Sequence, residues 1–257
     1  MRPLSSETPQ VLAGKAAVVT GSGRGVGRGI ALALADAGAA IAVCGRTPDV
    51  LAETAEEVRR RGGRAITVRC DVTDPAQIEV LVARTVAELG GIDILVNNAQ
   101  DSKAVGRLVD VDPEDFVKGF ASGPLATLRL MQACHPHLKG EGVVVNLGTA
   151  ASLRPDPVGY GCYGAVKEAI RALSRAAAVE WAADGIRVHV IVPLAGLERF
   201  QRERPEEAKV FIDSIPLGRI GHAERDVGRA VVFLCGPDSG YMTGNTLLID
   251  GGQAFLR

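Results

Sequence analysis

The chain has 257 residues, a formal net charge of −1, 47% hydrophobic residues and 23% charged residues. This balance is ordinary for a globular protein with a sizeable core, and the near-neutral charge argues against nucleic acid as a partner. No apolar run reaches membrane-spanning length, which argues against a membrane partner, and the polar residues 1–10 lack a signal peptide's apolar core. We expect a flexible N-terminal arm over residues 1–10 and a single domain over residues 11–257.

Apolar, strand-like runs alternate with helix-like stretches along the whole chain. The expected strands cover residues 16–19, 40–44, 65–68, 92–97, 142–147, 186–192 and 246–249. The expected helices cover residues 30–35, 48–61, 73–90, 112–138, 160–183 and 224–235. This alternation predicts an α/β fold with a parallel sheet and helices on both of its faces.

One segment, residues 194–221, has neither a strand period nor a helix period. It follows the carboxyl end of the strand expected at 186–192, and ligands of open α/β sheets bind at that edge. A long connection of this kind is usually functional. We therefore predict a substrate loop or lid over 194–221, whose mixture of apolar and charged residues suits an apolar or mixed organic carbonyl.

A glycine-rich turn follows the first expected strand and precedes the first expected helix. It reads Thr20-Gly21-Ser22-Gly23-Arg24-Gly25-Val26-Gly27, a looser relative of the dinucleotide-binding fingerprint. Glycines let the backbone approach a ligand, and the unpaired N–H groups of a helix N-terminus attract phosphate. The predicted cofactor-binding residues of this turn are Gly21, Ser22, Arg24, Gly25, Val26 and Gly27.

The second strand ends in Cys44-Gly45-Arg46, about 20 residues beyond the glycines. A carboxylate here would hold the ribose 2′-hydroxyl of NAD, but this chain has none. Arg46, together with Arg24 in the glycine-rich turn, can pair a 2′-phosphate instead. The sequence therefore favours NADP (NADPH) over NAD as the cofactor.

Two further strand ends reach the same edge of the sheet. Asp71 and Val72 follow the third strand, and Asp71 can accept a hydrogen bond from the adenine amino group. Asn98 and Ala99 end the fourth strand and are candidates for the backbone beside the nicotinamide ribose. Asn97 is equally well explained as a buried amide that ties neighbouring strands together.

Tyr163 and Lys167 stand four residues apart on the expected helix 160–183, so their side chains share one face. A nearby cation stabilises phenolate and lowers the pKa of a tyrosine, which suits acid/base chemistry. The hydroxyl of Thr149, at the end of the fifth strand, lies 14 residues before Tyr163 and at the same sheet edge.

These motifs, taken in order, resemble the short-chain dehydrogenase/reductase family from about Gly14 to Gly252. The resemblance implies a Rossmann-type, doubly wound parallel sheet of about seven strands, and NADPH-dependent hydride transfer at the carbonyl or alcohol of a small molecule. It implies Tyr163 as acid/base, Lys167 as its pKa-lowering and ribose-binding partner, and Thr149 as the group that orients the carbonyl. It also implies Pro193 beside the cofactor and a homotetramer or homodimer.

Several positions depart from the family pattern. Gln100 replaces the glycine of Asn-Asn-Ala-Gly, Leu194 replaces the glycine after Pro193, and the asparagine expected within helix 112–138 is Gly123. Without that asparagine a proton-relay water loses its support, and Pro124 is expected to kink the helix. An alternative therefore stays open: an NADP-binding protein with a non-redox role, such as an isomerase or cyclase, or a cofactor sensor.

The five cysteines, Cys44, Cys70, Cys134, Cys162 and Cys235, are scattered and odd in number. This usage favours reduced thiols and a cytoplasmic protein. The cluster Cys134-His135-Pro136-His137 contains metal-binding residue types, but it has no carboxylate, and we predict no metal site. The helices 113–138 and 160–183 carry more apolar surface than one sheet face needs, which predicts pairing between subunits.

Overall fold

The computed structural model describes residues 10–101, 104–154 and 159–256 and contains a seven-stranded parallel sheet in the order β3-β2-β1-β4-β5-β6-β7. The strands are β1 (Ala16–Thr20), β2 (Ala40–Gly45), β3 (Ala65–Arg69), β4 (Ile94–Asn97), β5 (Val143–Leu147), β6 (Arg187–Pro193) and β7 (Thr246–Ile249). The strand order reverses between β1 and β4, which confirms the predicted doubly wound, Rossmann-type fold. The predicted arm lies outside the described residues, apart from residue 10.

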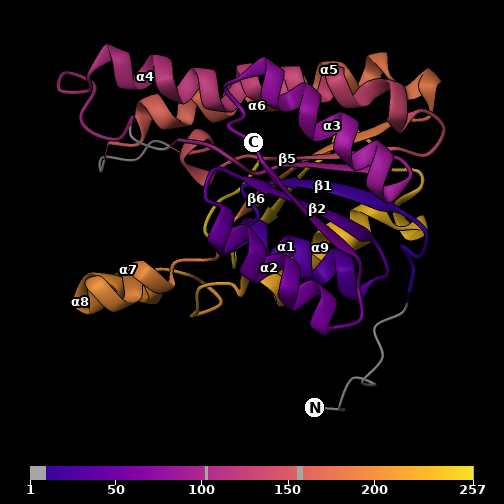
Figure 1. Cartoon of the computed structure of the whole chain (residues 1–257). Coiled ribbons are helices and arrows are strands. Elements are labelled where there is room, and N and C mark those ends of the chain that lie inside the picture. The colour runs from indigo at the N-terminus through magenta and orange to yellow at the C-terminus, as the bar shows by residue number, and fades with distance from the viewer. Residues whose placement is uncertain (1–9, 102–103, 155–158, 257) are drawn as a thin grey trace.

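Helices cover both faces of the sheet, as Figure 1 shows. One face carries α1 (Gly25–Asp36), α2 (Pro48–Arg60), η4 (Ala223–Gly228) and α9 (Arg229–Cys235). The other carries α3 (Pro75–Leu89), α4 (Pro113–Phe120), η1 (Ala121–Leu125), α5 (Ala126–Leu138) and α6 (Gly161–Glu180). Short helices follow at η2 (Ala150–Ser152), η3 (Ala182–Asp184) and η5 (Pro237–Ser239).

Two apolar cores form because successive residues of a strand point to opposite faces. Val19 and Val43 pack into the core beneath α1 and α2, whereas Val18 and Ala42 pack into the core beneath α3 and α5. All four are fully buried. Strands covered on both faces read as continuous apolar runs, which is why these segments are recognisable in the sequence.

Aspartate-proline pairs begin two of the helices where the sequence predicts helix starts. The Asp74 carboxylate accepts a 3.0 Å hydrogen bond from the backbone N–H of Ala76, and Asp112 accepts one of 2.9 Å from Glu114. Each bond satisfies a backbone N–H group in the first turn that has no partner within the helix. The proline at the first helical position has no N–H group, so it leaves no donor unpaired.

The helix expected over 112–138 is interrupted. A π-helical turn, η1, separates α4 from α5 and contains Pro124. Proline has no N–H and its ring clashes with the preceding turn, so the backbone widens locally. The predicted helix over 160–183 also ends earlier, since α6 stops at Glu180 and a 3₁₀ turn follows.

The interpretation of residues 194–221 as a stretch without helices is wrong. The segment holds α7 (Glu198–Glu203) and α8 (Pro205–Asp213), which form a hairpin that projects from the body of the molecule (Figure 1). The rings of Phe200 and Phe211 meet edge to face with their centroids 6.1 Å apart, so the hairpin packs largely against itself. A parallel bridge between Ala195 and Gly221 joins the two ends of the segment.

Candidate active site

The glycine-rich turn between β1 and α1 has the shape that a phosphate group needs. Gly21 has φ of +65°, a conformation that side chains disfavour, and a Cβ at Gly27 would lie 2.5 Å from the carbonyl oxygen of Gly21. Arg24 stands at the N-cap of α1 without a side-chain capping bond. The first N–H groups of α1 therefore remain for a ligand, and the turn fits the pyrophosphate of a dinucleotide.

Hydrogen bonds from the end of β4 hold this turn in place. The side-chain amide of Asn98 donates to the carbonyl oxygens of Thr20, at 2.9 Å, and Gly21, at 3.2 Å. In return, the Thr20 hydroxyl oxygen accepts from the backbone N–H groups of Asn98 and Ala99, each at 3.0 Å. Asn98 therefore lies at the predicted site, and the hydrogen bonds of its side-chain amide stabilise the conformation of the glycine-rich turn.

Ser22 is fully buried and its side chain faces the interior of the protein. Its hydroxyl donates to the carbonyl oxygen of Val19 at 2.7 Å and accepts from the N–H of Cys44 at 2.9 Å. These bonds fasten the glycine-rich turn to β1 and β2. The Ser22 hydroxyl, predicted as a cofactor contact, is used inside the fold instead.

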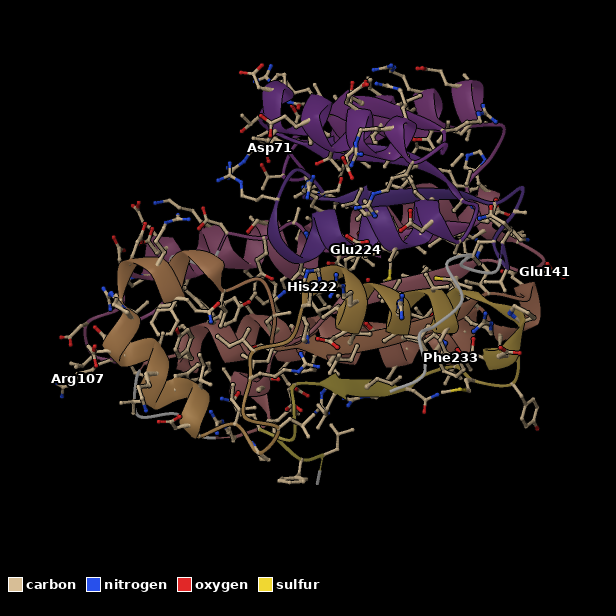
Figure 2. All side chains as sticks on the ribbon, turned by 90° about the horizontal axis from the view of Figure 1, so that it is seen from below. Asp71, Arg107, Glu141, His222, Glu224 and Phe233 are labelled. Atoms are coloured by element: carbon tan, nitrogen blue, oxygen red, sulfur yellow. The ribbon has the colours of Figure 1, made fainter. Side chains whose placement is uncertain are left out.

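A cleft of about 700 Å³ opens at the carboxyl ends of the central strands. Its lining includes nine predicted cofactor residues: Gly21, Arg24, Val26, Gly27, Arg46, Asp71, Val72, Asn98 and Ala99. Ser22, Gly25, Pro193, Thr149, Tyr163 and Lys167 are not part of this lining. Figure 2 shows Asp71 near this end of the molecule and Glu141 at the opposite end.

Other lining residues lie outside the predicted cofactor-binding set: Gly23, Gly45, Thr47, Val50, Leu51, Cys70, Thr73, Gln100, Asp101, Lys118, Ala121 and Ser122. Some of them adjoin predicted residues in the chain, so extending each motif by a few residues would have found them. Lys118, Ala121 and Ser122 come from α4 and η1, and no motif in the sequence marks them.

Arg24, Arg46 and Asp71 are charged residues that line the cleft. Arg24 and Arg46 are exposed and line the cleft, and the stretch Cys44-Gly45-Arg46 at the end of β2 contains no carboxylate. Hydrogen bonds from the backbone N–H and hydroxyl of Thr73, at 3.0 and 2.8 Å, lower the pKa of Asp71, and the positive charge of Arg46 lowers it further. Asp71 is therefore ionised at neutral pH.

Tyr163 and Lys167 face each other on α6, as their spacing predicts. The Lys167 Nζ lies 5.8 Å from the centroid of the Tyr163 ring and donates a 2.8 Å hydrogen bond to the carbonyl oxygen of Leu147. Burial lowers the pKa of Lys167 to about 7. Burial, with a smaller contribution from Tyr160, raises the pKa of Tyr163 to about 12.

This result corrects the expectation that Lys167 lowers the pKa of Tyr163 in the protein alone. Burial disfavours the charged form of each group, so the pKa of Tyr163 rises and that of Lys167 falls. Lys167 is only partly protonated near pH 7 and supplies less positive charge than an exposed lysine would.

Thr149 follows β5, close to the end of the strand that holds the Lys167 ammonium. Its hydroxyl oxygen accepts a 3.3 Å hydrogen bond from the N–H of Ala151 and so caps the short helix η2. Accepting this bond leaves the hydroxyl hydrogen able to donate to a ligand. Thr149 therefore presents a hydroxyl at this edge of the sheet.

The structural interpretation of Asn97 is the correct one of the two. Its buried side-chain amide donates to the Oδ1 of Asn146 at 2.8 Å, and the amide of Asn146 donates to Ser174 Oγ on α6, also at 2.8 Å. This chain of bonds joins β4, β5 and α6 through the core. It holds the helix that carries Tyr163 against the sheet.

Within the described part of the chain, no group of three or more histidine, cysteine, aspartate or glutamate side chains could hold a metal ion. His135 lies 2.9 Å from the carboxylate of Asp184 and packs edge to face on Trp181. Among the described residues, no helix is both long enough and apolar enough to span a membrane.

Comparison with known proteins agrees with this geometry. Residues 21–254 match a family model described as enoyl-(acyl carrier protein) reductase. The chain is 39% identical to the 12alpha-hydroxysteroid dehydrogenase of a Clostridium species over 254 residues, which are 95% of this chain and 98% of that protein.

Two solved structures are similar over nearly their whole length. A short-chain dehydrogenase from Burkholderia cenocepacia in complex with NADP has a TM-score of 0.86 and 29% identity, covering 94% of this chain and 98% of that one. A 7α-hydroxysteroid dehydrogenase complexed with NADH and 7-oxo glycochenodeoxycholic acid has a TM-score of 0.86 and 28% identity, covering 94% of each chain.

Proposed function

We propose that this chain, which belongs to the short-chain dehydrogenase/reductase family, reduces the carbonyl of a small organic molecule with NADPH, or catalyses the reverse oxidation. The premise of the proposal is that members of this family, including this chain, are NAD(P)-dependent oxidoreductases. The observation that carries the proposal is the pair on α6, in which the buried Lys167 Nζ lies over the ring of the half-buried Tyr163.

The residues of the pair have complementary roles in this proposal. The nicotinamide cofactor, when bound, supplies the hydride. Tyr163 donates its phenolic proton to the carbonyl oxygen, and the Thr149 hydroxyl donates a hydrogen bond that orients the same oxygen. The pKa of about 12 keeps Tyr163 protonated at neutral pH, as a proton donor must be. Lys167 binds the ribose and stabilises the phenolate that is left.

NADP is the proposed cofactor because Arg24 and Arg46 line the cleft while no carboxylate follows β2. A 2′-phosphate would form charge-assisted hydrogen bonds with both guanidinium groups. The glycine-rich turn holds the pyrophosphate, and Gly25, Val72, Ala99 and Pro193 contribute backbone or apolar contacts. One similar structure contains NADP and another contains NADH, so the preference rests on this chain's own arginines.

The proposed substrate is an apolar carbonyl compound of the hydroxysteroid or oxosteroid class. The relative with 39% identity acts, by its name, on the 12α-hydroxyl group of steroids. Exposed apolar side chains lie in the loop before α4 and beside Tyr163, including Leu108, Val109 and Tyr160. Residues 194–221, with their helical hairpin, form a lid over such a substrate.

We also propose a homodimer or homotetramer in the cytoplasm. Exposed apolar side chains on α4, η1 and α6, namely Val117, Phe120, Leu125 and Val179, supply a surface that a second copy would cover. The five cysteines are free, and Cys44, Cys70 and Cys134 are buried, which suits a reducing compartment.

The test is NADPH oxidation, followed by absorbance, against a panel that contains oxosteroids and simple aliphatic ketones. We expect turnover with at least one oxosteroid at a rate well above that without ketone. Tight NADPH binding without turnover on any carbonyl or alcohol would instead favour the non-redox or cofactor-sensing alternative. The intact pair of Tyr163 and Lys167 supports the redox function over that alternative.

A further inference from the structure

Gln100 follows β4 and lines the cleft. Its amide atoms, Oε1 and Nε2, are both buried, and neither has a hydrogen-bond partner among the described residues. Buried side-chain amides in proteins are nearly always hydrogen bonded. An amide that meets no protein partner is therefore a site for a water molecule or for a polar atom of a ligand.

This amide lies close against Gly123, where the backbone carries no side chain. A Cβ at Gly123 would lie 3.1 Å from Gln100 Nε2 and 3.2 Å from its Cδ. The same Cβ would lie 2.9 Å from Cγ1 of Val166. Gln100 and Gly123 are thus in direct proximity. A side-chain amide is supplied here by Gln100, after β4, and not by an asparagine at position 123 in η1.

Two structural relations connect the surroundings of Gln100 with Lys167. Val166, which the Gly123 position touches, immediately precedes Lys167 on α6. The Lys167 Nζ is held by the carbonyl oxygen of Leu147, at the end of β5, and β5 is the hydrogen-bonded neighbour of β4. The amide and the ammonium therefore approach the same edge of the sheet from two adjacent strand ends.

Ser122 fixes the backbone beside Gln100. Its hydroxyl oxygen accepts a 3.0 Å hydrogen bond from the N–H of Asp101, and its hydroxyl donates to the carbonyl oxygen of Lys118 at 2.9 Å. The one proton of this hydroxyl is used within the helix. Ser122 holds the segment that carries Gln100 and has no second proton to pass on.

We propose that Gln100 is a positioning residue whose amide holds a water molecule beside Lys167, and that this water returns protons from solvent to the Tyr163–Lys167 pair. The inference rests on the proposed carbonyl reduction. In each turnover the Tyr163 O–H bond breaks as the O–H bond of the product alcohol forms. One proton from solvent must then rebuild the tyrosine, and the water held by Gln100 delivers it.

The first test replaces Gln100 with methionine, which has a similar length and no amide. For Gln100→Met we expect the kcat of ketone reduction to fall roughly 10-fold or more, towards the range for a lost acid/base group. The KM for NADPH should stay within about twofold, and the solvent deuterium isotope effect on kcat should rise, because proton return becomes slower. Gln132→Met, at an exposed glutamine of α5, is the matched control.

The second test moves the amide back to the helix. Gly123→Asn alone should be strongly impaired, because its side chain competes with Gln100 for one space. Gln100→Gly combined with Gly123→Asn should recover at least tenfold of the kcat lost in Gln100→Gly. Val166→Ala, added to both members of this comparison, makes room if the asparagine prevents folding. Native kcat and a native isotope effect in Gln100→Met would overturn the proposal.

A crystal structure separates this inference from the proposed reaction. At high resolution, we expect a water molecule within hydrogen-bond distance of the Gln100 amide in the native protein and none at that position in Gln100→Met. A protein without reductase activity that still holds this water would contradict the proposed function alone. An active protein whose Gln100 amide holds no water would contradict the inference alone.

Discussion

The Lys167 ammonium nitrogen lies 5.8 Å from the centre of the Tyr163 ring, one helical turn away on the same face of α6. Both side chains lose most of their contact with water, and the pKa of each moves in the direction that favours its neutral form. Without bound cofactor, Tyr163 is therefore a protonated phenol at neutral pH, and the neighbouring Lys167 amine titrates near pH 7.

Replacing Tyr163 with phenylalanine should remove the proposed proton donor while keeping the aromatic packing. We expect kcat for ketone reduction to fall by at least the ~10²–10⁴-fold that general acid/base groups contribute. Affinity for NADPH, measured by fluorescence titration, should change little. Near-native turnover of Tyr163→Phe on a ketone that the native protein reduces would show that Tyr163 is not the acid.

Ser122→Ala should behave differently. The Ser122 hydroxyl bonds to the backbone of Asp101 and Lys118, so its loss weakens the local structure without removing a proton donor from the reaction. We expect a lower melting temperature and a decrease in kcat smaller than ~10²–10⁴-fold. Ser214→Ala, at an exposed serine after α8, serves as the control. A decrease as large as that of Tyr163→Phe would contradict this assignment.

Arg46→Ala should weaken the binding of NADPH more than that of NADH. The difference should be about 1–3 kcal/mol, the range for losing a hydrogen bond to a charged group. Arg24→Ala should have the same sign. Arg59→Ala, at an exposed arginine of α2, should leave both affinities unchanged. Equal affinity of the native protein for NADH and NADPH would exclude this basis for cofactor choice.

Burial of Lys167 predicts a pH dependence of stability. The unfolded chain keeps the ordinary lysine pKa of 10.5, whereas the folded pKa is about 7, so the unfolded state binds more protons between these values. The free energy of unfolding should therefore rise between about pH 7 and 10, by at most about 1.4 kcal/mol per pH unit from this group.

Lys167→Met removes this dependence and can be compared with native protein by thermal melts at several pH values. The stability gained by the substitution should be largest near pH 7 and should shrink as the pH rises towards 10. Lys209→Met, at an exposed lysine of α8 that pairs with Asp213, is the matched control. A gain independent of pH would show that Lys167 is charged in the folded protein throughout this range.

Light scattering at micromolar concentration should give the mass of a dimer or tetramer. Val179, 80% exposed on α6, and Val117, 64% exposed on α4, are the apolar side chains at which introducing a negative charge is most informative. Val117→Asp or Val179→Asp should lower the mass, since a charge in an apolar interface costs more than in water. A monomeric native protein would refute the assembly.

The parallel sheet is predictable because its strands are buried on both faces and appear as continuous apolar runs. The hairpin of α7 and α8 is not, because the contact between Phe200 and Phe211 joins two short helices and appears only in the folded structure. The π-helical turn lies between these cases. Pro124 predicts a break in the helix, but the widened turn depends on what packs around it.

The candidate site divides in the same way. Glycine spacing and the Tyr163–Lys167 pair predict local geometry, because each lies within one turn or one helix. Ser22 and Asn97 depend on partners from other strands, Cys44 and Asn146, and only the folded sheet brings these together. Gln100 and Gly123 are visible as separate departures from a motif, and their shared space is visible only in the structure.

The bridge between Ala195 and Gly221 brings together the two ends of the segment that contains the α7–α8 hairpin. A segment that leaves and rejoins the scaffold at neighbouring residues can be exchanged without moving the elements on either side. Residues 196–220 are therefore a segment that can be replaced by a different sequence while the rest of the fold is kept. Under the proposed function, replacing this segment would change substrate preference and leave the Tyr163–Lys167 pair on α6 unchanged.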